Sequence, residues 1–222
     1  MVGGGPAGVE IALALRARLD RTGPHETAPW IGLAAGSGLV PTLNARARGK
    51  VRAALARRQI EVFAPCRIAQ VGPQGAQDDS GRWIASDLTI VSTAARGPSW
   101  LAATDLPLAP DASVLVGPTL ASLGDDAIFA AGDCAEVAGE RREKAGVFAV
   151  RQGPPLALNL RRRVRREPGA DYRAQRAFLT ILSTGDGSAI AARGRWFAME
   201  GRWVWWWKDR IDRAFVSRFN AK

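Results

Sequence analysis

The chain has few of the residues on which metal sites, catalytic triads and disulfide frameworks depend. Among its 222 residues there is one histidine, His25, and there are two cysteines, Cys66 and Cys134, far apart in the sequence. A zinc site, a Ser-His-Asp triad and a disulfide framework are therefore disfavoured. We predict no metal site and assign no catalytic acid or base. Cys134, beside a predicted strand end, is interpreted as an inert small residue rather than a redox thiol.

Long apolar runs and lysine are also scarce. No run reaches the roughly 18 residues of a membrane span, and the N-terminus lacks a signal-peptide pattern, so we expect a cytoplasmic protein. The net charge is +10, and nearly all of the positive charge comes from arginine. This charge favours anionic partners such as dinucleotide phosphates, acidic lipid or nucleic acid, and does not choose among them. The apolar content of 47% is that of an ordinary globular protein.

The clearest motif is a glycine-rich stretch at the start of the chain. Gly3, Gly5 and Gly8 have the G-x-G-x-x-G spacing that opens a dinucleotide-binding helix. The first glycine permits a tight turn, the second lets the backbone approach a pyrophosphate, and the third lets helix and strand pack closely. We expect a helix from Pro6, with the pyrophosphate at its free N–H groups. The residues predicted to contact the dinucleotide here are Gly3, Gly4, Gly5, Pro6, Ala7 and Gly8.

The elements around this motif follow a Rossmann pattern with two departures. Only Met1 and Val2 stand where a strand of about five residues should precede the glycines. The next buried strand is predicted at 30–35, and its end lacks the carboxylate that usually takes the ribose hydroxyls of NAD. No adjacent arginine clearly argues for NADP. A helix is predicted at 43–59, and its arginines are interpreted as a solvated face rather than a phosphate site.

Several short strands and one apolar helix are predicted in the middle of the chain. The strands are expected at 60–63, 67–71, 82–84, 88–92, 90–95 and 114–116. A further buried strand at 127–135 is expected to stop at Gly132 and Asp133, where a carboxylate at a strand's carboxyl edge suits a chain of sugar-like hydroxyls. A plain turn with a capping aspartate is the alternative. The segment 145–160 is predicted as a helix that ends or restarts at Pro154 and Pro155.

The last fifty residues change in character. Short strands are predicted at 178–183, 188–193 and 195–199, followed by a helix within 201–219. Large apolar side chains recur every four residues along one stripe of that helix, at Trp203, Trp207, Ile211, Phe215 and Phe219. A basic amphipathic helix of this kind suits a membrane surface. Docking of the helix on its own domain or on a partner is the alternative.

Two motifs in this order resemble a known superfamily. VGGGPAGVE, followed far downstream by IFAAGDCAEV, is similar to the pyridine nucleotide–disulfide oxidoreductase superfamily in its type II NADH dehydrogenase-like branch. KAGVFAVRQGPPLALNL and WVWWWKDRIDRAFVSRF resemble more narrowly the flavoprotein domain fused to some selenide, water dikinases. The resemblance implies an FAD domain, split in sequence, around an inserted NAD(P)H domain.

The resemblance also implies roles for individual residues. The glycine motif would be the NAD(P)H motif, and Asp133 would hold the ribityl chain of the flavin. The helix that begins near Ala145 would point its N-terminus at the isoalloxazine, where its dipole stabilises negative charge on the reduced ring. Gln152 would lie close to that ring. The further residues expected to contact the cofactors are Ala95, Gly132, Asp133, Gly146, Val147 and Gln152.

The chain departs from the superfamily in what it lacks. The first G-x-G-x-x-G motif, which holds the pyrophosphate of FAD, is absent, as are the redox-active cysteine pair of the disulfide reductases and the kinase domain of the fusion. We therefore interpret the chain as an N-terminally truncated copy and expect weakened flavin binding.

Together these observations predict an α/β protein in three parts. Residues 1–104 would form a Rossmann-like NAD(P)H-binding domain with a small antiparallel insert, 105–168 the C-terminal portion of a split FAD-binding domain, and 169–222 an α+β segment with a basic aromatic helix. The predicted function is an FAD-dependent oxidoreductase that passes hydride from NAD(P)H to FAD and on to an unknown acceptor. A non-catalytic dinucleotide-binding or scaffold module is the alternative. Nucleic-acid binding is disfavoured, while a homodimer and peripheral contact with the inner face of a membrane stay open.

Overall fold

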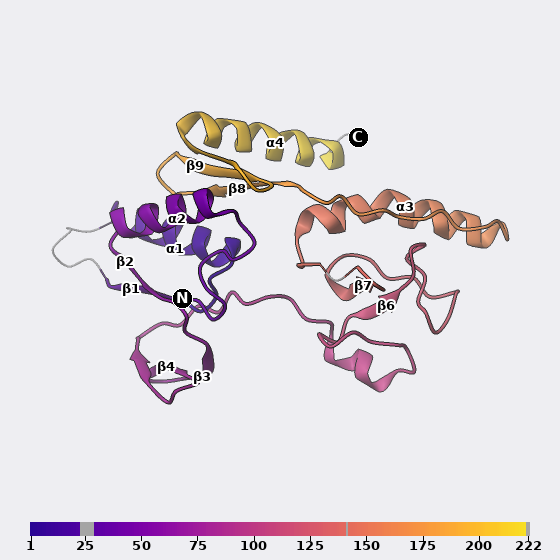
Figure 1. Ribbon diagram of the computed structural model, residues 1–222, viewed down its shortest axis with the longest axis horizontal. Helices are drawn as coiled ribbons and strands as arrows, with labels where there is room; N and C mark the ends of the chain where they lie inside the picture. Colours follow the sequence, from indigo (N-terminus) through magenta and orange to yellow (C-terminus); the bar gives the residue numbers. More distant parts are fainter. Residues whose placement is uncertain (23–28, 141, 221–222) are drawn as a thin grey trace. The chain divides into compact units, whose positions relative to one another are not determined.

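The computed structural model describes residues 1–22, 29–140 and 142–220 and divides into two compact units (Figure 1). Unit 1 comprises Met1–Thr93 and Ala177–Lys222, and unit 2 comprises Ala94–Arg176. His25 lies outside the described residues. The functional domain boundaries predicted after residues 104 and 168 stay predictions. The boundaries between the compact units lie elsewhere, after residues 93 and 176. Across the described ranges, none of the helices combines the length and apolarity that crossing a bilayer requires.

Short parallel strands form one layer of unit 1. β1 (Ile31–Ala34) pairs in parallel with β2 (Ile60–Phe63), and Val2 makes parallel bridges to Ala34 on one side and Val91 on the other. The order β2, β1, Val2, Val91 is the 3-2-1-4 order of a doubly wound nucleotide-binding sheet. The strands predicted at 88–92 and 90–95 are wrong. Within the described residues, this region makes only the single bridge between Val91 and Val2, because Val2 is the only residue beside it with which it can pair.

Two helices cover this layer, as the sequence predicts. α1 (Pro6–Leu19) begins with proline at its first helical position, where the missing N–H is no loss. α2 (Ala45–Arg57) begins at Asn44, whose side chain accepts a 2.9 Å hydrogen bond from the Ala47 amide and so caps the helix. Each helix buries one apolar face against the strands.

A small antiparallel insert follows β2, as predicted. It consists of β3 (Ile68–Gly72), β4 (Gly75–Asp78) and β5 (Trp83–Ala85), with β4 in the centre. The Asp78 carboxylate closes the turn after β4 by accepting hydrogen bonds from Ser80, and the hydroxyl of Ser80 is the main cause that holds the pKa of Asp78 below its ordinary value.

The C-terminal segment packs on unit 1. β8 (Leu179–Ser183), β9 (Ala189–Arg193) and β10 (Phe197–Gly201) form an antiparallel sheet with β9 in the centre, and α4 (Arg202–Asn220) follows. α1 and α2 contact one face of this sheet and α4 contacts the other, so that α1 and α2 lie between two sheets (Figure 1). The predicted strands and the predicted helix of this segment are confirmed.

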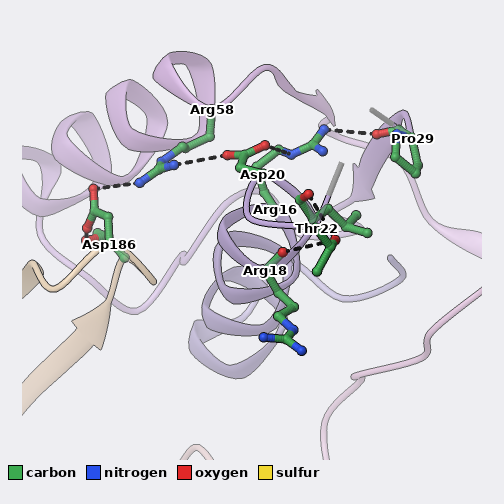
Figure 2. A network of polar contacts seen from close by, with 9 residues as sticks. Arg16, Arg18, Asp20, Thr22, Pro29, Arg58 and Asp186 are labelled. Carbon is green, nitrogen blue, oxygen red and sulfur yellow. Dashed lines mark hydrogen bonds and ion pairs between the residues drawn. The ribbon is translucent and has the colours of Figure 1, made fainter. Parts of the chain in front are cut away.

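A chain of ion pairs fastens the C-terminal sheet to the helices (Figure 2). Arg58, just after α2, contacts Asp20 at 3.2 Å and Asp186, in the β8–β9 turn, at 2.9 Å. Asp20 in turn pairs with the buried Arg16 of α1 at 3.0 Å, and Arg16 donates a 2.9 Å hydrogen bond to the Pro29 carbonyl. Both helices and the C-terminal turn are therefore joined through one arginine.

Unit 2 contains less regular structure. β6 (Val114–Val116) pairs in parallel with β7 (Ala135–Val137), and η2 (Ser99–Ala103) is a short 3-10 helix. The predicted strand at 127–135 is wrong: within it Phe129 makes one isolated bridge, and η3 (Gly132–Cys134) is a 3-10 turn. Gly132 has φ +71°, a left-handed conformation that ends extended backbone.

One helix, α3 (Gly146–Val164), completes unit 2, and it corrects a second prediction. It runs without a break through Pro154 and Pro155. The two carbonyls that lose their N–H partners belong to Val150 and Arg151, which are exposed. Because water can hydrate carbonyls at exposed positions, the helix continues where the sequence favours an interruption.

Candidate functional site

The glycine motif lies directly after Val2, in the turn that leads into α1, which is where doubly wound sheets bind nucleotides. Gly3 has φ +126°, and a Cβ atom built there would lie 2.0 Å from the main-chain oxygen of Ser92. A Cβ atom on Gly8 would lie 1.9 Å from the main-chain oxygen of Gly3. Gly3 and Gly8 are therefore required by the packing of the turn itself.

Gly5 is different, because the fold does not require glycine there. A Cβ atom built on Gly5 meets no atom within 4 Å, and its φ of −74° suits any residue. Gly5 is the N-cap of α1, no side chain caps that end of the helix, and Ala7 in the first turn is exposed. Open space in front of unsatisfied N–H groups is the cradle that a pyrophosphate needs. The arrangement fits a dinucleotide.

The chain that follows β1 is held against this motif. The Val40 amide donates a 2.7 Å hydrogen bond to the Gly4 carbonyl, and a Cβ atom on Gly4 would lie 2.3 Å from the Cβ atom of Ala35. The segment 34–37 contains no carboxylate. The end of β1 therefore lies beside the glycine motif, as in nucleotide-binding sheets, without the usual acidic group.

A hollow of about 350 Å³ beside this segment was not predicted from the sequence. The loop after β1 forms one wall, and a stripe of α2 forms the other. The hollow is lined by Ser37, Gly38, Leu39, Pro41, Ala45, Arg48, Gly49 and Arg52. Two of these residues are arginines that the sequence analysis assigned to a solvated face. The helical spacing of positions 45, 48, 49 and 52 is the signal from which a shared face could have been inferred.

A second group of predicted site residues comes together in unit 2. The Gly132 amide donates a 2.6 Å hydrogen bond to Oε1 of Gln152, which is buried although it is polar. A Cβ atom on Gly132 would lie 3.3 Å from the Cβ atom of Ala149, so η3 packs closely on α3. Asp133 is exposed next to this contact. Residues 132 and 133 of the 3-10 turn and residue 152 of α3 therefore lie together, and their role in cofactor binding stays a prediction.

The N-terminus of α3 has no side-chain cap. Ala145 is the N-cap in extended conformation, Gly146 is exposed and Val147 is half-buried. The first N–H groups of the helix, together with its dipole, favour negative charge at this end. This is the electrostatic environment that the resemblance assigns to the flavin ring.

A small cavity of about 40 Å³ lies between η3 and α3 and adds Tyr172 to the site. The Tyr172 hydroxyl is buried and has no hydrogen-bond partner in the described structure, and burial raises the pKa of this phenol above its ordinary value. Tyr172 is in a loop without a recognisable motif, so nothing in the sequence marks it. An unpaired buried hydroxyl in a residue that lines the same cavity as Gln152 is suited to bonding a ligand.

The wall of the same cavity contains Lys144, whose ammonium group is fixed by three contacts. It donates hydrogen bonds to the Ala135 carbonyl at 2.8 Å and to the Ser113 hydroxyl at 3.1 Å, and it pairs with Asp111 at 3.4 Å. Burial alone would raise the pKa of Asp111, but hydrogen bonds from Ser113 and the charge of Lys144 outweigh it and lower that pKa. Lys144 therefore holds the chain just before α3 in a fixed position.

The residues of unit 2 fit the flavin end of FAD in chemical type. Asp133 offers a carboxylate to hydroxyl groups, and α3 offers its positive end to an electron-rich ring. The predicted contact of Ala95 stays a prediction, and Ala95 is an exposed residue of unit 2. Within the described ranges, no group of three or more His, Cys, Asp or Glu residues could hold a metal ion, and Cys66 and Cys134 are free thiols.

The comparison with known families assigns a family to most of the chain. A family model described as pyridine nucleotide-disulphide oxidoreductase matches residues 1–157. The chain belongs to this family. Its members are FAD-dependent enzymes that bind NAD(P)H, and the match extends from the glycine motif to the first turns of α3. The broad family resemblance is therefore confirmed, while no curated protein matches the chain in sequence.

Solved structures share the fold. The sulfide:quinone oxidoreductase of Aquifex aeolicus has a TM-score of 0.74 at 18% identity, covering 98% of this chain and 56% of its own. A FAD-dependent pyridine nucleotide-disulphide oxidoreductase from Desulfovibrio vulgaris has a TM-score of 0.64 at 20% identity, with 87% and 48% covered. The water-forming NADH oxidase of Lactobacillus brevis, bound to NADH, has a TM-score of 0.64 at 20% identity, with 87% and 42% covered. The chain thus spans about half the length of these structures.

Proposed function

We propose that the chain forms the NAD(P)H-binding and flavin-proximal part of an FAD-dependent oxidoreductase. In the complete enzyme, two electrons and one proton would pass as hydride from NAD(P)H to FAD and then to an acceptor that is still unknown. The observation that carries the proposal is the open Cβ position of Gly5 at an uncapped helix N-terminus. A glycine that the fold does not need is best explained by the close approach of a ligand.

Unit 1 would bind the nucleotide by its main chain. The free N–H groups at the start of α1 would take the pyrophosphate, and the dipole of α1 would favour its negative charge. Gly3 and Gly8 would act indirectly, since their lack of a Cβ atom sets the shape of the turn. No side chain in the motif needs to titrate, so this binding step should depend little on pH near neutrality.

Unit 2 would bind the flavin end of FAD, which supplies the redox chemistry when bound. Asp133 would accept hydrogen bonds from hydroxyl groups, and the N-terminus of α3 would stabilise negative charge. Gln152 would act by holding Gly132 through their 2.6 Å hydrogen bond. Tyr172 would donate its unpaired hydroxyl hydrogen to the ligand, which a phenol with a raised pKa can do throughout the neutral range.

The test is an equilibrium titration of the purified chain with FAD, followed by anaerobic addition of NADPH or NADH. We expect flavin fluorescence to change on binding and the visible flavin absorption to bleach when the reduced nucleotide is added. Asp133→Asn should weaken flavin binding, whereas Asp171→Asn, a change at an exposed aspartate of unit 2, should not. Nucleotide binding without flavin binding would favour the non-catalytic module, and binding of neither would overturn the proposal.

A membrane contact through α4 is proposed as a second property of the chain. Only Val204 of this helix is buried, whereas Trp206 and Phe219 are 71% and 73% exposed. Exposed aromatic side chains together with several arginines suit the headgroup region of an anionic bilayer. The acceptor is unknown. Three predictions stay predictions: a homodimer, location at the inner face of a membrane, and the narrower resemblance to flavoprotein domains of selenide, water dikinases.

A further inference from the structure

We propose that the hollow between α2 and the loop after β1 binds the 2′-phosphate of the dinucleotide, so that the chain selects NADPH over NADH. This inference rests on the proposed nucleotide binding at the glycine motif and adds the identity of the nucleotide. It depends on the position of the hollow, on the charge of its walls and on the absence of an acidic group.

The position follows from main-chain contacts. The loop that forms one wall of the hollow is joined to the glycine motif by the 2.7 Å hydrogen bond from the Val40 amide to the Gly4 carbonyl. A Cβ atom on Gly4 would also lie 2.9 Å from the Gly38 carbonyl oxygen. In a doubly wound sheet the adenosine ribose lies over the end of this strand. A group on the ribose 2′-oxygen would therefore point toward the hollow.

The charge of the hollow is unbalanced. Arg48 and Arg52 line it one helical turn apart, and among the described residues no ion pair or hydrogen bond engages either guanidinium group. Other basic side chains near this helix are paired, since Lys50 and Arg57 contact Glu200. Like charges four residues apart on a helix destabilise it. A phosphate dianion between the two arginines would remove that repulsion and gain charge-assisted hydrogen bonds.

The walls also suit a phosphate in shape and in what they lack. Gly49 and Ala45 lie on the same stripe of α2 and leave room between the arginines, and the Ser37 hydroxyl is a further donor on the opposite wall. An acidic side chain at the end of β1 would repel a 2′-phosphate, and the segment 34–37 contains none. The absence of the carboxylate that is typical of NAD sites thus favours binding of the phosphorylated nucleotide.

The experiment is a set of calorimetric titrations of the full chain with NADPH, NADH, adenosine 2′,5′-bisphosphate and adenosine 3′,5′-bisphosphate. We expect NADPH to bind about tenfold or more tightly than NADH, because each charge-assisted hydrogen bond contributes on that scale. The 2′,5′-bisphosphate should compete with NADPH, and its 3′,5′-isomer, with the same charge, should compete far less. Arg48→Gln and Arg52→Gln should each reduce the preference for NADPH and leave the affinity for NADH unchanged.

Arg46→Gln is the matched control, because Arg46 is an exposed arginine of α2 that does not line the hollow. If Arg46→Gln weakens NADPH binding as much as Arg48→Gln and Arg52→Gln do, only the general charge of the protein matters and the inference is overturned. Equal affinity for NADPH and NADH in the unaltered chain would also overturn it, while leaving the nucleotide site intact. Failure of both nucleotides to bind would overturn this inference together with the proposed function.

Discussion

The Val40 amide donates a 2.7 Å hydrogen bond to the Gly4 carbonyl, and through this bond the loop after β1 is fixed to the glycine motif. The contact places two different surfaces next to one another: the uncapped start of α1 and the arginine-lined hollow of α2. One surface is suited to a pyrophosphate and the other to a phosphate monoester. Their adjacency would give unit 1 the two anion sites that we propose for a phosphorylated dinucleotide.

Gly8 should tolerate substitution less well than a glycine whose Cβ position is open. Gly8→Ala should lower the free energy of unfolding by about 1–3 kcal/mol, because its Cβ atom would overlap the Gly3 carbonyl oxygen. Gly153→Ala is the matched control, because a Cβ atom at Gly153, inside α3, meets no atom within 4 Å. It should stabilise the protein by about 0.5–1 kcal/mol. Urea unfolding measures both, and equal effects of the two variants would contradict this account.

Gln152 should stabilise unit 2 through its acceptor oxygen. Gln152→Leu would leave the partly buried Gly132 amide without its partner, which we expect to cost about 1–3 kcal/mol. Gln152→Glu keeps an oxygen in the same place and should cost less at neutral pH. Chemical denaturation of the three proteins tests this, and a leucine variant as stable as the unaltered chain would show that the hydrogen bond is unimportant.

Part of the free energy of unfolding should be lost at acid pH because of Asp186. Burial alone would raise its pKa, but hydrogen bonds from Thr184 and Arg58 and the charge of Arg58 lower it below the ordinary value. Since the folded pKa is the lower one, the stabilisation is present above the ordinary aspartate pKa and is lost as the pH falls through the folded value. Asp186→Asn should therefore cost about 0.2–1 kcal/mol at pH 7, as partly exposed pairs do, and almost nothing in strong acid.

The control for this measurement is Asp87→Asn, at an exposed aspartate outside the ion-pair chain of Figure 2. Its effect on unfolding should be small and nearly the same at both pH values. If the free energies of unfolding of the Asp186→Asn and unaltered proteins differ by the same amount at pH 7 and in strong acid, the charge of Asp186 does not stabilise the protein.

α4 should bind anionic vesicles if it contacts membranes. The double variant Trp206→Ser with Phe219→Ser removes its two most exposed aromatic side chains and should reduce co-sedimentation with vesicles. Trp100→Ser is the control, since Trp100 is 65% exposed in unit 2 and is not part of the helix. Undiminished vesicle binding after deletion of residues 202–222 would exclude α4 as the contact.

The parts of the fold that follow from local periodicity were predicted well. α1, α2, α4 and the strands of the C-terminal sheet lie where apolar spacing and turn residues place them. The strand expected at 127–135 fails for a tertiary reason, because an apolar run does not reveal whether a partner strand is available, and Phe129 finds only one bridge. The break expected at Pro154 fails because the sequence does not show that Val150 and Arg151, whose carbonyls lose their N–H partners, are exposed residues.

The candidate site was predicted where a motif fixes it and missed where distant segments meet. Gly5 and Gln152 belong to recognisable patterns, and the structure gives each a distinct environment. Arg48 and Arg52 are exposed, as their assignment to a solvated face predicts, but a helical pattern does not show that they line a hollow with the loop after β1. Tyr172 reaches its cavity through a loop, and no periodicity describes such a path.

The central claim is that the N–H groups at the start of α1 bind a dinucleotide pyrophosphate, and Gly5→Asp tests it most directly. Aspartate is a better N-cap than glycine and complements the helix dipole, so this variant should be as stable as the unaltered chain or more so. The same carboxylate would occupy the N–H groups and repel the pyrophosphate. For Gly5→Asp we predict unchanged or raised thermal stability, together with loss of NADPH and NADH binding measured by calorimetry. A Gly5→Asp protein that binds both nucleotides as tightly as the unaltered chain would contradict this claim.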